Sequence, residues 1–389
     1  MQTRSHRRHR LSRTGRRVIS IVSAVVLGPA TLTTVALVIG PVANAAGPNN
    51  GFGYVWADSP STQIGVPYTP SSLYQFNSAN RVNTITRTGT GAYSVRFPDF
   101  GPRGTALVTA YGGPSTRPDD RCKIRRWSAI PGGPSSPDDT VLEVRCFTRT
   151  GAAVDSLFTA SYTFPAPGAA RSAYLLYDQP GGPVNPNFSY NSTGAANRVT
   201  RIGTGRYTVR LPGLALPPPP ADVPQQVKVT AYGSGSAYCS VENVDDSAGA
   251  DTVAEVHCFS SGGSRVDSGF TLSSVETGDI LFTPAGSRPM AYATPECQPD
   301  PLGCVEGGRT FPSGAFISKV GPGQYDLRVP LSLDGGNVQV GNWWTGRSAG
   351  RVTCKVAFWT SSSGVRVNCF DRFGNPPTVP TTFAVSFVQ

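Results

Sequence analysis

The sequence predicts an all-β protein in which three tandem antiparallel β-sandwich domains follow an N-terminal signal helix. Three observations predict it. One segment recurs three times along the chain, a pair of cysteines follows each copy, and apolar residues alternate with polar ones at a period of two. Beyond the N-terminal region no convincing run has helical spacing, and glycine and proline interrupt the chain every few residues.

The repeated segment is an alternating strand that follows a glycine turn and ends at a proline. Tyr93, Val95 and Phe97 alternate with Ser94 and Arg96, Gly91 precedes them, and Pro98 ends the run. The copies of this segment span residues 86–98, 200–212 and 318–330, and a second shared segment spans residues 108–112, 229–233 and 340–344. Pro- and Gly-rich joins divide the chain into a leader at 1–45 and β repeats at 46–166, 167–285 and 286–389.

All eight cysteines lie after the leader, and an even number in an exported chain predicts disulfides. Each repeat carries one pair at matching positions, and the third repeat adds a closely spaced pair of its own. The expected bridges are Cys122–Cys146, Cys239–Cys258, Cys354–Cys369 and Cys297–Cys304. Because a complete repeat with its bridge lies within residues 167–285, we expect this segment to fold alone.

The N-terminus has the pattern of a secretory signal peptide. Seven arginines fall within the first 17 residues, an uncharged apolar stretch runs from Val18 to about Val42, and Ala43-Asn44-Ala45 offers a cleavage site. The alternative is an uncleaved membrane anchor, since the stretch is long enough to span a bilayer. Helix breakers next to the cleavage site favour cleavage before Ala46. We therefore expect a secreted, extracellular protein that has no membrane segment after cleavage.

Charge and motif content exclude several classes of function. Removing the seven leader arginines leaves 27 basic and 24 acidic residues, a net charge of +3, which predicts no nucleic-acid partner. The chain has no Walker loop, nucleophile elbow, zinc-protease motif or Cys-x-x-Cys pair. We therefore expect no enzyme activity, no cofactor and no metal site.

The few candidates for chemistry each have a structural alternative. His257, the sole histidine after the leader, is predicted to be an exposed strand residue. The acidic pairs at 119–120, 138–139 and 245–246 are predicted to be solvated turn residues rather than paired catalytic or calcium-binding carboxylates. The recurring Arg96, Arg210 and Arg328, with the recurring pairs at 155–156 and 267–268, represent either one ligand contact per domain or cross-strand ion pairs.

Tryptophans are the remaining candidates for a binding surface. Trp343, Trp344 and Trp359 cluster in the third repeat, and exposed indole rings stack on sugars. Neighbouring residues on a strand face opposite ways, so at most one of Trp343 and Trp344 faces outward. The alternative for Trp359 is packing against the core.

The repeated motif resembles repeats in secreted actinobacterial proteins of unknown function. Its parts are Asn-Ser, Gly-x-Gly-x-Tyr-x-Val, Val-Thr-Ala-Tyr-Gly and Cys-Phe, and they cover nearly the whole chain after the leader. The Gly-x-Gly-x-Tyr-x-Val core is also similar to C1q-like modules of phage tail fibres. Those modules associate as trimers, so the resemblance implies that three linked copies form a pseudo-trimer.

These observations lead to one expected function and two alternatives. We expect a non-catalytic binding or structural protein of three disulfide-pinned repeats, each a jelly-roll or immunoglobulin-like sandwich, that recognises a polysaccharide or another component of the cell envelope. The alternatives are an inhibitor of secreted proteases, with the loop between Cys122 and Cys146 as bait, and a carboxylate-dependent hydrolase.

Overall fold

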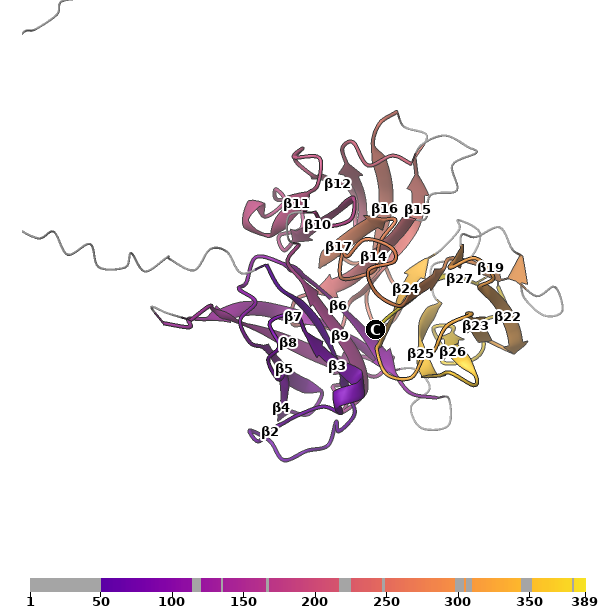
Figure 1. Ribbon diagram of the computed structural model, residues 1–389. Coiled ribbons are helices and arrows are strands. Elements are labelled where there is room, and N and C mark those ends of the chain that lie inside the picture. Colours follow the sequence, from indigo (N-terminus) through magenta and orange to yellow (C-terminus); the bar gives the residue numbers. More distant parts are fainter. Residues whose placement is uncertain are drawn as a thin grey trace, which may run out of the picture. The chain divides into compact units, whose positions relative to one another are not determined.

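The computed structural model confirms an all-β fold, and Figure 1 labels many of its strands. It describes residues 50–113, 120–133, 136–165, 168–216, 225–246, 249–297, 304–305, 310–343, 352–379 and 381–389. The predicted leader, residues 1–45, lies outside this part of the chain. Within the described part, the helices are two short 3₁₀ turns, and no helix has the length and apolar character needed to cross a membrane.

The strands of the three repeats follow one another in the same order along the chain. The first repeat contains β1 (Phe52–Ala57), β2 (Pro67–Tyr68), η1 (Ser72–Tyr74), β3 (Gln75–Asn77), β4 (Thr84–Gly89), β5 (Ala92–Phe97), β6 (Thr105–Tyr111), β7 (Arg121–Ile130), β8 (Asp139–Phe147) and β9 (Leu157–Thr163). The second contains β10 (Ser172–Tyr177), η2 (Pro186–Phe188), β11 (Ser189–Asn191), β12 (Arg198–Gly203), β13 (Arg206–Leu211), β14 (Gln225–Tyr232), β15 (Tyr238–Asp245), β16 (Thr252–Phe259) and β17 (Gly269–Glu276). The third contains β18 (Met290–Ala293), β19 (Glu296–Cys297), β20 (Cys304–Val305), β21 (Thr310–Phe311), β22 (Phe316–Gly321), β23 (Gln324–Arg328), β24 (Asn337–Trp343), β25 (Thr353–Thr360), β26 (Gly364–Phe370) and β27 (Thr381–Val388).

Each repeat divides its strands between two sheets. One half, here called the inner half, has the order β6-β9-β1-β3 in the first repeat, β14-β17-β10-β11 in the second and β24-β27-β18-β21 in the third. The other, the outer half, has the order β7-β8-β5-β4-β2, β15-β16-β13-β12 and β25-β26-β23-β22. Pairing within each half is antiparallel.

The three sheets each combine strands of two repeats. The inner half of the second repeat joins the outer half of the first, where β14 pairs with β7 at Tyr232 and Ile124. The inner half of the third joins the outer half of the second through β24 and β15, and the inner half of the first joins the outer half of the third through β6 and β25. These three joining contacts are parallel, and they connect the repeats in a closed cyclic order. We call them junctions 1–2, 2–3 and 3–1.

The glycine turn behaves as the sequence predicts. Gly91, Gly205 and Gly323 precede the alternating strand of their repeats and have positive φ angles of 62°, 61° and 64°. A Cβ at Gly91 would lie 2.5 Å from the carbonyl oxygen of Cys146, and the other two glycines meet the same obstacle at Cys258 and Cys369. The turn therefore requires glycine for both its backbone angle and its close approach to the cysteine strand.

Burial differs between the two kinds of half-sheet. Strand β8 in an outer half alternates between buried and partly exposed residues, as a strand with one solvated face does. Strands β17 and β27 in the inner halves are buried at every position. One face of each inner half packs on the core of its own repeat, and the other face meets the neighbouring repeats. The polar residues of the inner strands therefore lie in the interior.

Each repeat has its own apolar core between its two halves. Val95, Phe97 and Phe158 are fully buried in the first core, Val209 and Phe270 have matching positions in the second, and the third has its own cluster around Leu327 and Phe383. The division into repeats at 46–166, 167–285 and 286–389 stays a prediction, since the separate folding of these segments is untested.

Three of the four expected disulfides are present. Cys122–Cys146, Cys239–Cys258 and Cys354–Cys369 each join directly opposed residues of neighbouring antiparallel strands, with a Cα–Cα distance of 4.0 Å. Cys297 and Cys304 face each other in the β19–β20 backbone pairing, but their side chains lie outside the described residues. The fourth bridge therefore stays a prediction.

Because every sheet spans two repeats, we predict that the protein unfolds in guanidinium chloride as one cooperative transition, followed by circular dichroism and by tryptophan fluorescence. Residues 167–285 expressed alone retain a core and a disulfide but lose both junction partners, so their unfolding midpoint should fall below that of the whole protein. Three separate transitions, with the fragment as stable as the whole protein, would contradict this expectation.

Candidate ligand-binding site

Buried side-chain amides and hydroxyls join the inner halves of the first and third repeats, next to junction 3–1. The Thr109 hydroxyl lies 2.8 Å from the amide oxygen of Gln339 and accepts the backbone N–H of Val340 at 3.0 Å. The Thr159 hydroxyl donates to the carbonyl oxygen of Val338 at 2.6 Å, and the amide of Asn337 donates to that of Val55 at 3.0 Å. These polar groups satisfy one another, so the interface is both polar and buried.

Lys228 on β14 takes the corresponding role between the second and third repeats. Its Nζ is fully buried and donates to the carbonyl oxygens of Gln339 at 3.2 Å and Ala384 at 2.9 Å. Burial lowers the pKa of Lys228 from 10.5 to about 7, because loss of water disfavours the charged amine. The strand registers show that Leu107 in the first repeat and Gln339 in the third repeat occupy the position of Lys228.

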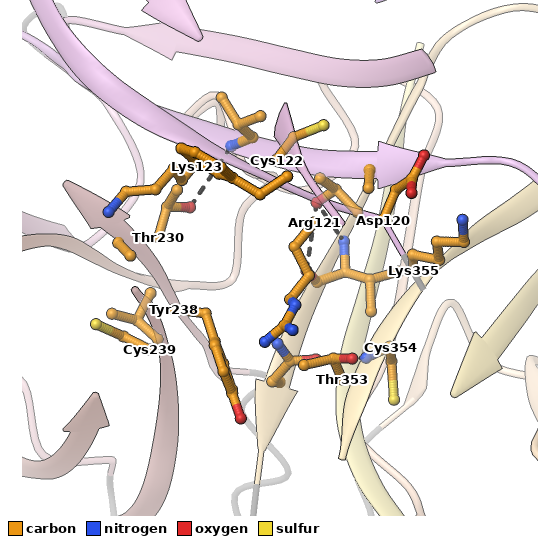
Figure 2. Close-up of a pocket in the computed structure, with 18 of the residues that line it drawn as sticks. Asp120, Arg121, Cys122, Lys123, Thr230, Tyr238, Cys239, Thr353, Cys354 and Lys355 are labelled. Atoms are coloured by element: carbon orange, nitrogen blue, oxygen red, sulfur yellow. Dashed lines mark hydrogen bonds between the residues drawn. The ribbon is translucent and has the colours of Figure 1, made fainter. Parts of the chain in front are cut away.

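A narrow cavity lies where the three repeats meet (Figure 2). Strands β6, β14 and β24 line it together with Cys122, Cys239 and Cys354, so every repeat contributes matching residues. Asp120, Arg121 and Lys355 add charge, and the Arg121 guanidinium stacks over the Tyr238 ring at 4.3 Å. Its volume is about 60 Å³, which holds a few water molecules but no sugar. We call it the axial cavity.

A second and larger cavity opens beside it, between the first and second repeats. Lys123 of β7 forms one wall, and the second repeat supplies the rest from residues 178, 180, 232–233, 235–237, 260 and 266–269. Its volume of about 510 Å³ falls in the range of small-molecule sites. The lining combines the polar side chains of Asp178, Ser236 and Ser260 with apolar surface, which includes the half-buried ring of Tyr232. We call it the lateral cavity.

Lys123 lines both cavities and is unusual among the described charged residues. The residue is only 5% exposed, and within the described part of the chain no carboxylate forms an ion pair with its amine. Burial lowers the pKa of Lys123 to about 8. Figure 2 shows its side chain running past Thr230 and pointing away from Arg121 and Asp120. This chain therefore leaves a buried cation at the wall of the lateral cavity.

Trp359 and Trp343 are engaged in contacts within and between repeats. Trp359 is 4% exposed, donates its indole N–H to Gly335 at 2.7 Å, and packs at right angles to Tyr111 across junction 3–1. Trp343 is half-buried at junction 2–3 and donates to Val227 at 2.9 Å. Core packing, the structural alternative for Trp359, is what the structure shows. Trp344 lies outside the described residues.

The same aromatic contact occurs at junction 1–2. Trp127 occupies the position of Trp359 in the first repeat and packs edge-on against Phe188 and Tyr232 of the second. Its indole N–H donates to the carbonyl of Pro102 at 3.0 Å. The tryptophan that follows the first cysteine by five residues is therefore a contact between repeats, which explains its recurrence without a ligand.

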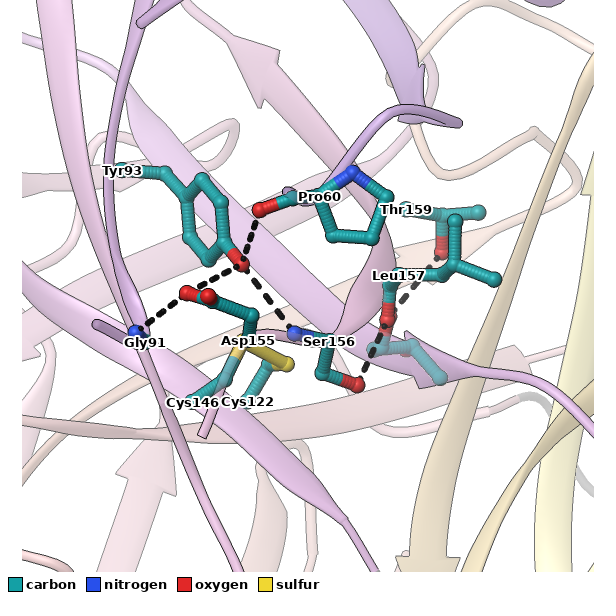
Figure 3. The surroundings of a disulfide bond; sticks show 10 residues. Pro60, Gly91, Tyr93, Cys122, Cys146, Asp155, Ser156, Leu157 and Thr159 are labelled. Atoms are coloured by element: carbon teal, nitrogen blue, oxygen red, sulfur yellow. Dashed lines mark hydrogen bonds between the residues drawn. A yellow bond between two sulfur atoms is a disulfide. The ribbon is translucent and has the colours of Figure 1, made fainter. Parts of the chain in front are cut away.

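The recurring acidic residue beside the disulfide is a structural anchor (Figure 3). Asp155 accepts the backbone N–H of Gly91 at 2.8 Å, the guanidinium of Arg87 at 2.7 Å and the hydroxyl of Tyr93 at 3.3 Å. In the second repeat Asp267 makes the same contacts with Gly205, Arg201 and Tyr207. Hydrogen bonding to Arg201 lowers the pKa of Asp267 to about 2. The third repeat has Thr378 at the corresponding place, nine residues after its second cysteine.

Two of the three recurring outward arginines form ion pairs between strands, as the structural alternative predicts, and the third pairs within its own strand. Arg96 pairs with Asp139 and Arg210 with Asp251, in each case across neighbouring strands or their ends. Arg328 pairs with Asp326 of its own strand at 3.5 Å. These arginines therefore have intramolecular partners, and they define no ligand contact by themselves.

His257 is buried, so the expectation of an exposed strand residue is wrong. Its side chain lies between two carboxylates, with Nε2 2.7 Å from Glu255 and Nδ1 3.2 Å from Glu242. Alternation along β16 did point it away from the disulfide face, but residues of β15 and of the same strand cover that face. Because the ring is 2% exposed, a substrate has no access to it.

The acidic pairs are also less solvated than predicted. Asp139 and Asp120 are both buried, Asp139 because Arg96 and the backbone N–H of Asp99 surround it. Asp138 accepts the N–H of Gly132, and Asp246 accepts the hydroxyl of Thr252 at 2.7 Å. Asp119 lies outside the described residues. Among the described residues, no group of three His, Cys, Asp or Glu side chains is arranged to hold a metal ion.

Sequence reasoning missed two buried lysines, Lys228 between the second and third repeats and Lys123 at the cavities. The pattern Val-Lys-Val-Thr-Ala at 227–231 looks like a strand with a solvated polar face, and Lys123 follows a cysteine in a similar alternation. Comparison among the repeats was the one available signal. The position of Lys228 is leucine or glutamine in the other repeats, and the position of Lys123 is serine in the second repeat.

Comparison with known proteins gives no match: no family model, curated protein or solved structure is similar to the chain. The resemblances to actinobacterial secreted repeats and to C1q-like modules therefore stay predictions.

Lys228 predicts an unusual pH dependence of stability. Its pKa is lower in the folded protein, so between about pH 7 and pH 10 the unfolded chain binds more protons. The free energy of unfolding should therefore rise with pH in this window, by up to about 1.4 kcal/mol per pH unit from this group. Lys228→Gln, which copies the third repeat, should remove that contribution when denaturant curves are compared across pH. Identical pH profiles for the two proteins would contradict the assignment.

The contacts of Asp155 predict that its substitution lowers the free energy of unfolding, and an exposed carboxylate offers a matched control. Asp155→Asn removes the charge that Arg87, Gly91 and Tyr93 share, and should cost about 1–3 kcal/mol of unfolding free energy. Asp334→Asn changes an exposed carboxylate and should stay within about 0.5 kcal/mol of the parent. Equal effects of the two substitutions on the unfolding midpoint would show that Asp155 is not an anchor.

Proposed function

We propose that this chain is an exported, non-catalytic binding protein that recognises a glycan of the cell envelope or extracellular matrix. In this proposal residues 1–45 are a cleaved signal peptide, and each repeat is a β-sandwich of jelly-roll or immunoglobulin-like type. Three disulfides are consistent with an oxidising compartment.

The observation that carries the proposal is the lateral cavity. Its volume suits one or two sugar rings, and its lining offers hydroxyls, a carboxylate and an aromatic ring, which are the groups that recognise sugar hydroxyls and ring faces. The neighbouring junction strands are pinned by disulfides and buried hydrogen bonds. A pre-formed wall of this kind lowers the ordering cost of binding.

The engagement of the charged residues supports a non-catalytic role. A hydrolase needs a carboxylate or histidine that reaches its substrate. Asp155 and Asp267 hold turns, Asp139 and Asp251 pair with arginines, and His257 is enclosed by glutamates. Asp178 in the lateral cavity is left for a ligand, but glycoside hydrolysis uses a pair of carboxylates, and the other carboxylate of the cavity, Asp267, is held by Arg201. The described chemistry therefore favours binding over hydrolysis.

Retention of the purified protein on isolated cell-envelope material and on a panel of insoluble polysaccharides tests the proposal. We expect retention, and we expect Gly235→Tyr to abolish it, because Gly235 lines the lateral cavity and a side chain at this position meets no protein atom within 4 Å. Gly113→Tyr, equally unhindered but outside the cavity, is the control and should be retained.

Other results would favour the alternatives. Release of reducing sugars from the panel would identify a hydrolase. Inhibition of secreted proteases without retention on any polysaccharide would identify an inhibitor.

A further inference from the structure

We propose that the lateral cavity binds an acidic sugar, a uronic acid residue whose single carboxylate pairs with Lys123. This inference rests on the proposed glycan-binding function and deepens it. It names the chemical class of the ligand and the residue that selects it.

The charge of the cavity wall is the first argument. A buried amine without a counter-charge is costly, and an anion at hydrogen-bond distance from Lys123 would offset that cost. With its pKa near 8 the amine is mostly protonated at neutral pH, so it offers a cation to the ligand.

The acidic residues of the cavity limit the charge that the ligand carries. Asp267 is occupied by Arg201, while Asp178 accepts the side-chain amide of Asn185 at 3.1 Å and leaves other lone pairs for a ligand. A dianion such as phosphate would have one cation to pair with and two carboxylates nearby. A monoanion with several hydroxyls pairs with Lys123 and donates to Asp178 and to the serines.

Comparison of the three junctions shows that a lysine beside a lateral cavity occurs at junction 1–2. Strand registers place Ser240 and Lys355 at the position of Lys123 in the other repeats. Ser240 carries no charge, and the Lys355 amine lies 6.0 Å over the ring of Phe370 beside the axial cavity. One acidic-sugar site per chain follows from this difference.

The test compares glucuronate and galacturonate with glucose and galactose by calorimetry and NMR titration. The variants are Lys123→Ser, which copies the second repeat, Lys123→Gln as a second neutral substitution, and Lys355→Ser as the control. Lys123→Ser and Lys123→Gln should weaken uronate binding about tenfold or more. They should leave binding of the neutral sugars within about twofold, and Lys355→Ser should bind like the parent. Melting temperatures establish that each variant is folded.

The outcomes separate this inference from the proposed function. Equal affinity for uronates and neutral sugars, or unchanged uronate binding in both Lys123 variants, would overturn the acidic-sugar inference while glycan binding stands. Failure of the parent protein to bind any sugar or polysaccharide would overturn both.

Discussion

The structure depends on the burial of the polar faces of its inner strands. A strand with Lys228, Thr230 and Gln226 on one face is stable in water, but here that face is covered by other repeats, so each polar group needs a partner. The partners come from the neighbouring repeats: Gln339 and Thr109 across one junction, and Gln226 and Ser386 across another. The cyclic pairing of the sheets brings these partners together, so the sheet topology and the polar interior require each other.

Local pattern was enough to predict the strands, the turns and the three disulfides now seen. Alternation around Tyr93 and the required glycine at Gly91 depend on neighbours in sequence, so a single chain reveals them. The pairing of half-sheets from different repeats could not be predicted from the strand pattern, because the residues at each parallel contact carry no distinctive type. Tyr232 and Ile124, for example, would suit any strand. Alternation indicates that two faces differ, but it does not tell whether water or another repeat covers the polar one.

The candidate site was also hard to predict, because the residues that stand out in the sequence are not the ones that line it. Tryptophans are conspicuous in sequence and were natural candidates for sugar stacking, but a large amphipathic ring serves equally well as a contact between domains. Trp127 and Trp359 do so, and their indole N–H groups are already used. Lys123 is inconspicuous in sequence, since nothing around it distinguishes a buried amine from a solvated one. Its role depends on how β7 meets the second repeat, which becomes visible only when the chain is folded.

Because the three repeats pair in a closed cycle, the same set of junctions forms whichever repeat comes first in the chain. Tyr54 of β1 and Val388 of β27 belong to one apolar cluster, so the first and last strands come together where a third connection between repeats would run. A circularly permuted chain that begins at the second or third repeat keeps all three junctions available. Duplication or deletion of one repeat disrupts the cycle, because one half-sheet is then surplus or missing at a junction. Unlike an open solenoid, which gains and loses units freely, this arrangement fixes the copy number at three.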